Sequence, residues 1–503
     1  MSEHFDAIII GGGTAGCVAA ARLSEDPDRK VLLVERGADP QPIPDMVADP
    51  KQALRLRTES PYIDRYPTER NFDKSTFDSL AGRILGGGSA VNMMSIVRPI
   101  RADFDAWVAA GNPEWAWEKV LPVFKRMEAD QDFPDGPLHG RDGPLYVKRG
   151  RSFDDRLAGI EKAFVEGALS LGLPKCPDQN VPNPLGIAPT LFNIKNGRRQ
   201  SAADAYLGPA RSRPNLSIVA EALVTSLQGE GNRVEAVHYE KDGQAQSVLA
   251  DLIIVSAGVY HSPQILMLSG IGPPAELERH GIQTVHAMNG VGENFQDHAV
   301  VFMDFEGGKK HQEERLISGF ILYVKSDPNR THLDSQVMVR PPTVVQDSRP
   351  IYRISAHLLE QRTRGRVFLK SADPREPPGI DPQMLEDPED VSAMVSVMQF
   401  VEGLAQTKPM KEYFGPLLRP DPGGNWAEYA RSSYDSFRHG VGTCRMGPAS
   451  DDKAVVDERL RVHGMANLFV ADASIMPTVP HAHTNLAAMM IGERVADFIR
   501  EDT

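Results

Sequence analysis

The sequence predicts an α/β fold that opens with a βαβ unit of the kind that binds a dinucleotide. Residues 7–10 form a short apolar run of strand length, and an alanine-rich helical stretch follows within the next ten residues. Between them stand three glycines in the G-x-G-x-x-G spacing: Gly11, Gly13 and Gly16. A second apolar strand, residues 30–34, ends in Glu35, 19 residues after Gly16, which is about the interval at which a carboxylate reaches a ribose. Strand, turn, helix and acid together favour a nucleotide site over a glycine turn that binds nothing.

Each glycine of this turn has its own physical role. The first permits a tight turn, the second lets the backbone approach a pyrophosphate, and the third lets the helix pack close to the strand. The phosphates then lie at the partly positive N-terminus of the helix. We therefore expect this unit to contact the dinucleotide through Gly11, Gly13, Thr14, Ala15, Gly16, Glu35 and Arg36.

Composition and charge narrow the function classes. The chain has 503 residues, 41% of them hydrophobic, which is enough for about two to four domain-sized cores. A net charge of −13 disfavours binding to nucleic acid or to an anionic membrane, and no stretch approaches the roughly 20 apolar residues of a spanning helix. The first strand begins at about Asp6, which leaves no room for a signal peptide, and the three cysteines are widely spaced. We expect a cytoplasmic protein, and no sequence feature specifies its oligomeric state.

A second glycine-rich segment carries a resemblance to a known family. Residues 38–80 are rich in proline and charge and predict a long surface excursion, which ends in GRILGGGSAVN at residues 82–92. This segment resembles the first signature, G-R-x-L-G-G-S-S-x-x-N, of the glucose-methanol-choline (GMC) oxidoreductases, which are FAD enzymes that oxidise alcohols. It departs from the pattern at Gly88 and, farther on, at Ile96. The resemblance implies flavin contacts from Arg83, Leu85, Gly88, Ser89, Asn92, Met93, Met94 and Ser95.

Three later segments continue the likeness. GVYHSPQILMLSGIG at residues 258–272 is similar to the second family signature, and GVGENFQDH at residues 290–298 follows it. By resemblance, the backbone of Val224 holds the adenine end of FAD. Covalently flavinylated members use a histidine at the position of Val91, so the resemblance implies non-covalent FAD.

The family fold implies two interleaved domains. We expect an FAD-binding Rossmann-like domain built from residues 1–155, 196–300 and 426–503. Residues 156–195 and 301–425 would form an α+β substrate-binding domain on a mixed sheet, with short strands and a helix at about 388–406. This second region shares much less with the family than the first.

Two C-terminal motifs supply the candidate catalytic residues. The family places a histidine before V-G-T-C-R-M-G, here His439, and a histidine or asparagine about 43 to 44 residues later, here His483. By resemblance His439 is the base that takes the hydroxyl proton, and His483 hydrogen-bonds the alkoxide oxygen. An imidazole is largely neutral at pH 7 and can accept that proton. His481 lies two residues away on the same loop, and only the motif alignment ranks His483 above it.

The C-terminal helix completes the expected flavin site. Residues 485–499 have helical apolar spacing, and the family begins this helix beneath the flavin. Its N-terminal N–H groups would favour the negative charge that develops on the reduced ring. From this region we expect flavin contacts from Asp472, Ala473, Thr484 and Asn485.

Three residues are assigned to the substrate: Phe437, Arg438 and Arg340. The family commonly has an uncharged residue in place of Arg438, so a guanidinium there could favour a substrate with a carboxylate or phosphate. The alternative is that Arg438 points away and pairs with a surface acid, and the sequence does not decide between the two.

We therefore expect oxidation of a primary alcohol, aromatic or acid-bearing alcohols included, to the aldehyde by hydride transfer to flavin N5. Reoxidation by dioxygen would give hydrogen peroxide. A dehydrogenase with another acceptor, a hydroxynitrile lyase and a fatty acid photodecarboxylase on the same scaffold remain alternatives. A binding protein without catalysis is the least favoured, since both histidines are present.

Overall fold

The first sheet of the protein is built on the predicted βαβ unit. The computed structural model describes residues 3–69, 77–310, 319–343 and 350–502. Five parallel strands run in this order: β11 (Leu216–Val219), β2 (Val31–Val34), β1 (His4–Ile10), β14 (Gln244–Val255) and β25 (Leu468–Val470). The first half of the long strand β14 also pairs with an antiparallel hairpin of β12 (Ala222–Glu230) and β13 (Arg233–Lys241). The side chains of residues 7–10 in β1 and 31–34 in β2 are buried, as is typical of parallel strands that are covered on both faces.

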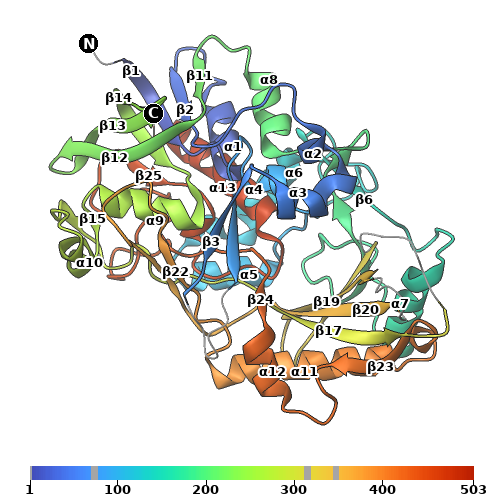
Figure 1. Ribbon diagram of the computed structural model, residues 1–503. Helices are drawn as coiled ribbons and strands as arrows, with labels where there is room; N and C mark the ends of the chain where they lie inside the picture. The colour runs from blue at the N-terminus through green and yellow to red at the C-terminus, as the bar shows by residue number, and fades with distance from the viewer. Residues whose placement is uncertain (1–2, 70–76, 311–318, 344–349, 503) are drawn as a thin grey trace.

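Two helices lie side by side against this sheet (Figure 1). Helix α1 (Thr14–Leu23) follows β1, and α13 (Thr484–Glu501) is the predicted C-terminal helix. They approach closely at Gly492, where an added Cβ would lie 2.5 Å from the Ala15 carbonyl oxygen and 2.8 Å from the Val18 Cβ. Because glycine has no Cβ, the two backbones can come together here.

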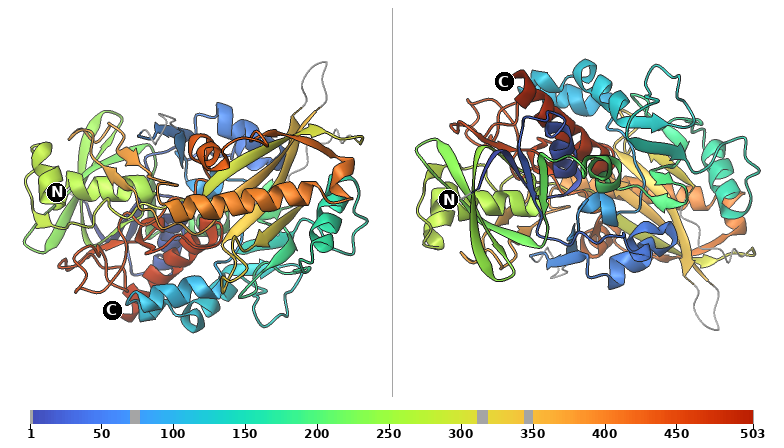
Figure 2. Two further views of the ribbon diagram at one scale, coloured as in Figure 1. Left: turned by 90° about the horizontal axis from the view of Figure 1, so that it is seen from below. Right: turned by 90° about the horizontal axis from the view of Figure 1, so that it is seen from above.

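The second sheet belongs to the middle of the chain. Its strands run in this order: β23 (Phe414–Arg419), β17 (Ala299–Gly307), β20 (Ile351–Leu358), β19 (Ser335–Thr343), β18 (Phe320–Val324) and β7 (Gly186–Pro189). Helix α11 (Pro388–Ala405), predicted at 388–406, lies across its outer face, as the left view in Figure 2 shows. The α/β fold with a second, sheet-based part is confirmed. One detail differs from the expected mixed sheet. All the strand pairs described in this second sheet are antiparallel, so neighbouring strands run in opposite directions.

Strand alternation divides the second sheet into an apolar and a polar face. Val339 and Ile354 are paired across β19 and β20 and are buried in the same apolar cluster as α11. The neighbouring pair, Arg340 and Arg353, therefore lies on the opposite face, as does Ser355. Because α11 covers the apolar face, the polar face is the one that can contact the part of the protein built on the first sheet.

The two parts of the chain interleave. Strand β24 (Asp435–Ser436), from the C-terminal segment, pairs with β17, and β7 pairs with β18. The exact boundaries of the two predicted domains stay a prediction.

The segment 38–80 is more ordered than a surface excursion. It forms α2 (Asp45–Ala48), α3 (Ala53–Glu59) and a hairpin of β3 (Ile63–Pro67) with β4 (Asp78–Gly82), while residues 70–76 lie outside the described part. Val47, Leu56 and Ile63 pack into an apolar cluster that also holds Val91. The scattered apolar residues were too few to reveal this cluster as a periodic pattern.

Throughout the described ranges, no helix combines the length and the apolar character needed to cross a bilayer.

We predict that Gly492→Ala lowers the stability of the holoprotein by about 1–3 kcal/mol, because the new methyl group has no space between α1 and α13. Gly403→Ala in α11 is the matched control, since its added Cβ meets nothing within 4 Å. That control should raise stability by about 0.5–1 kcal/mol through helix propensity. Thermal unfolding of both variants measures the difference, and equal melting temperatures would show that the helices do not touch at Gly492.

Candidate active site

The β1–α1 turn has the shape that the glycine spacing requires. Gly11 has φ of +100°, and an added Cβ there would lie 2.5 Å from the Ser256 carbonyl oxygen. A Cβ on Gly16 would collide with the Gly11 carbonyl. A Cβ on Gly13, in contrast, would meet only one atom, at 3.8 Å. The first and third glycines are thus needed for packing, and the second leaves its side of the turn open.

Glu35 stands at the end of β2 with its carboxylate held by backbone. Its two oxygens accept the N–H of Gly12 (2.7 Å) and of Gly37 (2.6 Å). Burial raises the pKa of Glu35, while these two hydrogen bonds oppose the rise. The carboxylate is therefore fixed in orientation beside the glycine turn.

Two predicted cofactor contacts have partners within the protein. Arg36 pairs with Asp64 and donates to the Tyr66 hydroxyl at 3.0 Å. Arg83 lies 3.8 Å from the same Asp64, and its side chain is 53% exposed. Both guanidinium groups are thus engaged at the β3–β4 hairpin.

The second glycine segment touches the first. A Cβ on Gly87 would lie 2.8 Å from the Gly13 Cα, and the Ser89 N–H donates to Thr14 Oγ1 at 3.2 Å. Helix α4 (Gly88–Val91) starts beside this contact, and a Cβ on Gly88 would meet nothing closer than 4.0 Å. The two segments therefore form one glycine-lined surface.

The other predicted cofactor residues surround this surface. Leu85 packs on Gly12, and the Asn92 side chain accepts from the Met94 N–H at 2.9 Å. Asp472 joins two elements by accepting from Gly258 N–H at 2.9 Å and Ser474 N–H at 2.7 Å. The remaining ones lie at the start of α1, after α4, on β12, after β25 and at the start of α13: Ala15, Met93, Ser95, Val224, Ala473, Thr484 and Asn485.

The residues present fit a bound FAD. The buried atoms Ser95 Oγ, Asn485 Nδ2 and His483 Nε2 have no hydrogen-bond partner within the protein. Beside them the glycine faces are open, and a Cβ on Gly258, which has φ of +83°, would meet nothing within 4 Å. Because buried polar atoms are normally satisfied, these atoms and the open glycine surface indicate a polar ligand. Thr14 Oγ1 is 3.2 Å from Asn485 Oδ1, so the turn and α13 border the same space.

The two predicted catalytic histidines lie together although 44 residues separate them. The ring centroids of His439 and His483 are 5.1 Å apart. Phe437 packs against both, with centroid distances of 4.4 Å to His439 and 5.5 Å to His483. The two imidazoles therefore share one apolar neighbour.

A chain of hydrogen bonds defines the proton position on His439. His298 Nε2 is 3.0 Å from the Pro480 carbonyl oxygen, which can only accept, so this nitrogen of His298 carries the proton. Neutral His298 must then accept at Nδ1, which lies 2.9 Å from His439 Nδ1. His439 consequently carries its proton on Nδ1 and presents Nε2 as a free acceptor.

Burial keeps these imidazoles neutral. Burial, together with the neighbouring His298 and His483, holds the pKa of His439 well below its usual value. Burial lowers the pKa of His483 to about 4 and that of His298 to about 3. At neutral pH all three are uncharged, as a group that must accept a proton needs to be.

His481 has the opposite environment. Its Nδ1 is 2.6 Å from an oxygen of buried Asp103. Although burial opposes it, this carboxylate, with Glu360, raises the pKa of His481 to about 9. His481 is therefore a charged partner of Asp103, whereas His483 is neutral. Sequence alignment could only rank His483 above His481, and their surroundings distinguish the two.

Sequence reasoning missed two histidines of this cluster. His298 touches His439, and His357 packs on Phe437 with centroids 4.2 Å apart. His298 is the last residue of the family-like segment at 290–298, so the sequence could have identified it as a candidate site residue. His357 had none, because its place depends on the register of β20.

The assignment of Arg438 to the substrate is not supported by its contacts. Its guanidinium pairs with Asp435 at 2.9 Å and donates to the Ser436 carbonyl oxygen. These contacts resemble the second of the two arrangements that the sequence left open, and a contact of Arg438 with the substrate stays a prediction. Arg340, in contrast, lies at the histidines, with Nη2 3.5 Å from His357 Nε2.

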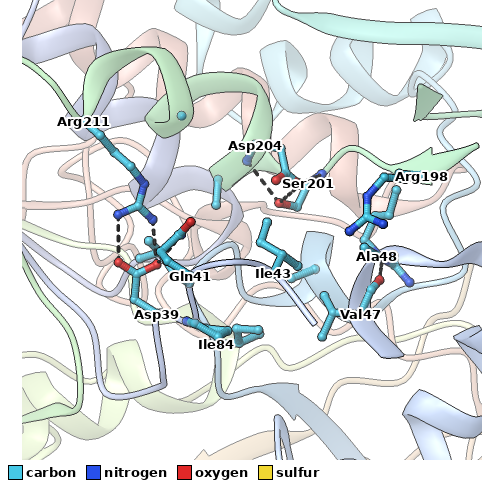
Figure 3. A pocket seen from close by; sticks show the side chains of 16 residues that line it. Asp39, Gln41, Ile43, Val47, Ala48, Ile84, Arg198, Ser201, Asp204 and Arg211 are labelled. Carbon is cyan, nitrogen blue, oxygen red and sulfur yellow. Dashed lines mark hydrogen bonds and ion pairs between the residues drawn. The ribbon is translucent and has the colours of Figure 1, made fainter. Parts of the chain in front are cut away.

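A separate cavity of about 310 Å³ lies between residues 39–48, 84–90 and 198–211 (Figure 3). Arg211 crosses its wall to Asp39 with two bonds of 2.8 and 2.6 Å, and Arg198 pairs with Asp45 at 3.2 Å. None of the four histidines of the cluster lines it. The lining residues Arg211 and Asp39 pair with each other, and the cavity is distinct from the histidine site.

Comparison with known proteins agrees with this geometry. Family models described as GMC oxidoreductase match residues 5–300 and 361–492. The chain is 32% identical to an "Alcohol dehydrogenase [acceptor]" of Pseudomonas putida, covering 98% of this chain and 95% of the relative. It is also 32% identical to a 5-(hydroxymethyl)furfural oxidase of Methylovorus sp. (strain MP688), covering 98% of each.

A solved structure is similar over the same length. It is pyridoxine 4-oxidase from Mesorbium loti, 31% identical, with a TM-score of 0.92 and 99% of each chain covered. The glycine surface, the open polar atoms and these matches lead to one conclusion: the chain belongs to the GMC oxidoreductase family and is an FAD-dependent alcohol oxidoreductase.

Proposed function

We propose that this enzyme oxidises a primary alcohol to the aldehyde, with His439 as the base, non-covalently bound FAD, and dioxygen as the final electron acceptor. One observation carries the proposal. The bond between His298 and His439 leaves His439 Nε2 free, and His483 faces that ring at a centroid distance of 5.1 Å.

The two histidines divide the work on the hydroxyl group. His439 Nε2 takes the hydroxyl proton, because its Nδ1 proton is already committed to His298. The Ser95 carbonyl oxygen lies 3.5 Å from His483 Nδ1 and can only accept, so this contact favours the proton on Nδ1 in the free protein. Because the contact is long, His483 can give it up at low cost, carry its proton on the unpartnered Nε2 and donate to the alkoxide oxygen. Bound FAD supplies the acceptor for the hydride that leaves the same carbon.

Phe437 and the C-terminal helix support this arrangement. Phe437 packs on both imidazoles and excludes water from one side of the pair. The unpartnered Asn485 Nδ2 and the first N–H groups of α13 are donors suited to an electron-rich ring. Val91, which is buried among apolar side chains, offers no nucleophile for a covalent flavin link.

The names of similar proteins bear on the electron acceptor. The names of two similar proteins, 5-(hydroxymethyl)furfural oxidase and pyridoxine 4-oxidase, support dioxygen. The name "Alcohol dehydrogenase [acceptor]" favours a second candidate, a dehydrogenase with another acceptor.

We predict that His439→Asn slows flavin reduction by an alcohol about 10²–10⁴-fold, the usual contribution of a general base, while FAD remains bound. Anaerobic stopped-flow absorbance measures the rate. His481→Gln is the matched control on the other loop histidine, and it should change the reduction rate far less because His481 pairs with Asp103. If His481→Gln lost more of the reduction rate than His439→Asn, His439 would not be the base.

The pH dependence follows from the lowered pKa values. A base acts when neutral, so a lowered pKa extends activity toward acid. We expect kcat/KM to stay level from neutral pH to well below 6.5 and to fall as the pH approaches about 4, the pKa of His483. Flavin absorbance checks that FAD stays bound across the series. An acid limb centred near 6.5 would contradict the buried, neutral cluster.

The acceptor is tested by mixing the yellow holoenzyme anaerobically with primary alcohols and then admitting air. We expect bleaching with an alcohol and peroxide on reoxidation. Bleaching that reverses only with an artificial acceptor would establish the dehydrogenase, and no bleaching with any primary alcohol would contradict the proposed function.

A further inference from the structure

Arg340 places an uncompensated positive charge at the candidate active site. Its Nε donates to Ser355 Oγ at 3.0 Å, and its Nη2 is 3.5 Å from His357 Nε2. Burial and the charges of Arg57 and Arg353 lower the pKa of Arg340 to about 10, and burial keeps His357 neutral. Among the residues that the structure describes, Arg340 has no carboxylate partner.

Other arginines, on this sheet and on the loop that leads into β19, do have partners. Arg353, directly opposite Arg340 across β19 and β20, binds Asp304 through two bonds of 2.6 and 3.0 Å. Arg330 binds Glu360 at 2.6 Å. A half-buried guanidinium without an anion is costly, so its retention beside the histidines needs an explanation.

Arg57, on α3, adds a second positive charge to the same region. Its charge lowers the pKa of both His439 and Arg340, so it lies within electrostatic reach of the base and of the arginine. In the described part of the chain it forms no ion pair. The nearby acid Asp435, which acts on Arg57, is already paired with Arg438 at 2.9 Å.

Asp297 is the other carboxylate at the histidines, and it is occupied as well. It accepts from the backbone N–H of His298 at 2.7 Å and of His439 at 2.8 Å, and from the Ser436 hydroxyl. Its oxygens hold the loop that carries the base. They do not reach the arginine side chains as ion-pair partners.

We propose that the alcohol substrate carries an anionic group, a carboxylate or a phosphate, that binds Arg340 with Arg57 in support. This inference rests on the proposed alcohol oxidation. A guanidinium presents a planar fork of donors that matches both anions, which is why arginine is the usual residue for such recognition.

A short series of contacts connects Arg340 with the proposed base. His357, which touches Arg340, packs on Phe437 at 4.2 Å, and Phe437 packs on His439 at 4.4 Å. Arg340 and the proposed base are therefore connected through the contacts of His357 and Phe437. An aromatic ring with a hydroxymethyl group at one end and an anion at the other is the kind of substrate that can present both groups to this region.

The test compares matched alcohols on the holoenzyme: benzyl alcohol, 4-(hydroxymethyl)benzoate and 4-(hydroxymethyl)phenyl phosphate. We expect kcat/KM for at least one anion to exceed that for benzyl alcohol by about tenfold or more. Arg340→Gln should lower this anion-to-neutral ratio about tenfold, and Arg57→Gln should lower it less. The preferred anion distinguishes a carboxylate substrate from a phosphate one.

Arg353→Gln is the matched control, because it removes the same charge from the same face of the sheet. Asp304 then keeps Arg419, 3.4 Å away, as a partner. The ratio should not change in this variant. Equal ratios in Arg340→Gln, Arg353→Gln and the unmodified enzyme would overturn the inference.

A binding measurement separates this inference from the proposed function. Benzoate and phenyl phosphate cannot be oxidised as alcohols, and at least one should raise the melting temperature of the holoenzyme more than benzamide does. That difference should disappear in Arg340→Gln. Bleaching by benzyl alcohol with no response to either anion would overturn the anion site alone, whereas anion binding without bleaching by any alcohol would overturn the proposed oxidation alone.

Discussion

The structure depends on the close packing of α1 against α13. Gly492 allows the two backbones to meet at Ala15, directly after the glycine turn, and Thr14 is bonded to Asn485 across the same contact. Because α13 begins immediately after His483, this packing fixes the position of that histidine relative to the glycine turn. The cofactor surface and one of the two candidate catalytic groups are thus parts of one rigid unit.

His439, the proposed base, is held from the other part of the protein. Asp297 accepts the backbone N–H of His439, and His298, the next residue, bonds to the His439 ring. His298 directly precedes β17 in the second sheet, while its own proton goes to Pro480 on the loop that carries His483. The orientation of the base therefore depends on contacts that join the two sheets, and neither part alone would produce it.

Much of this could be predicted from local sequence. The apolar runs and glycine spacing define β1, α1 and β2, and helical periodicity located α11 and α13 to within one or two residues. The pairing of His439 with His483 came from family motifs, because no local pattern connects residues so far apart. Arg438 could not be placed in this way: its φ of +66° turns the side chain back to Asp435, three residues earlier. Arg340 and His357 meet only through the register of β19 and β20, which the short alternating strands did not specify.

The electrostatics of the site connect the base with the proposed anion. The positive charges of Arg57 and Arg340 disfavour protonation of His439 and His483, respectively, so these charges help to keep both imidazoles neutral. A neutral base with a very low pKa is available but weak, since its protonated form is destabilised. An anion on Arg340 would cancel part of the positive charge that acts on His483 and raise the proton affinity of that imidazole at the moment when the substrate hydroxyl arrives. An uncharged alcohol would leave His483 as it is in the free enzyme. The same arginine would then select the substrate by its charge and adjust the histidine proposed to bind the alkoxide, which is a stronger reason for a guanidinium without a carboxylate partner among the described residues than recognition alone.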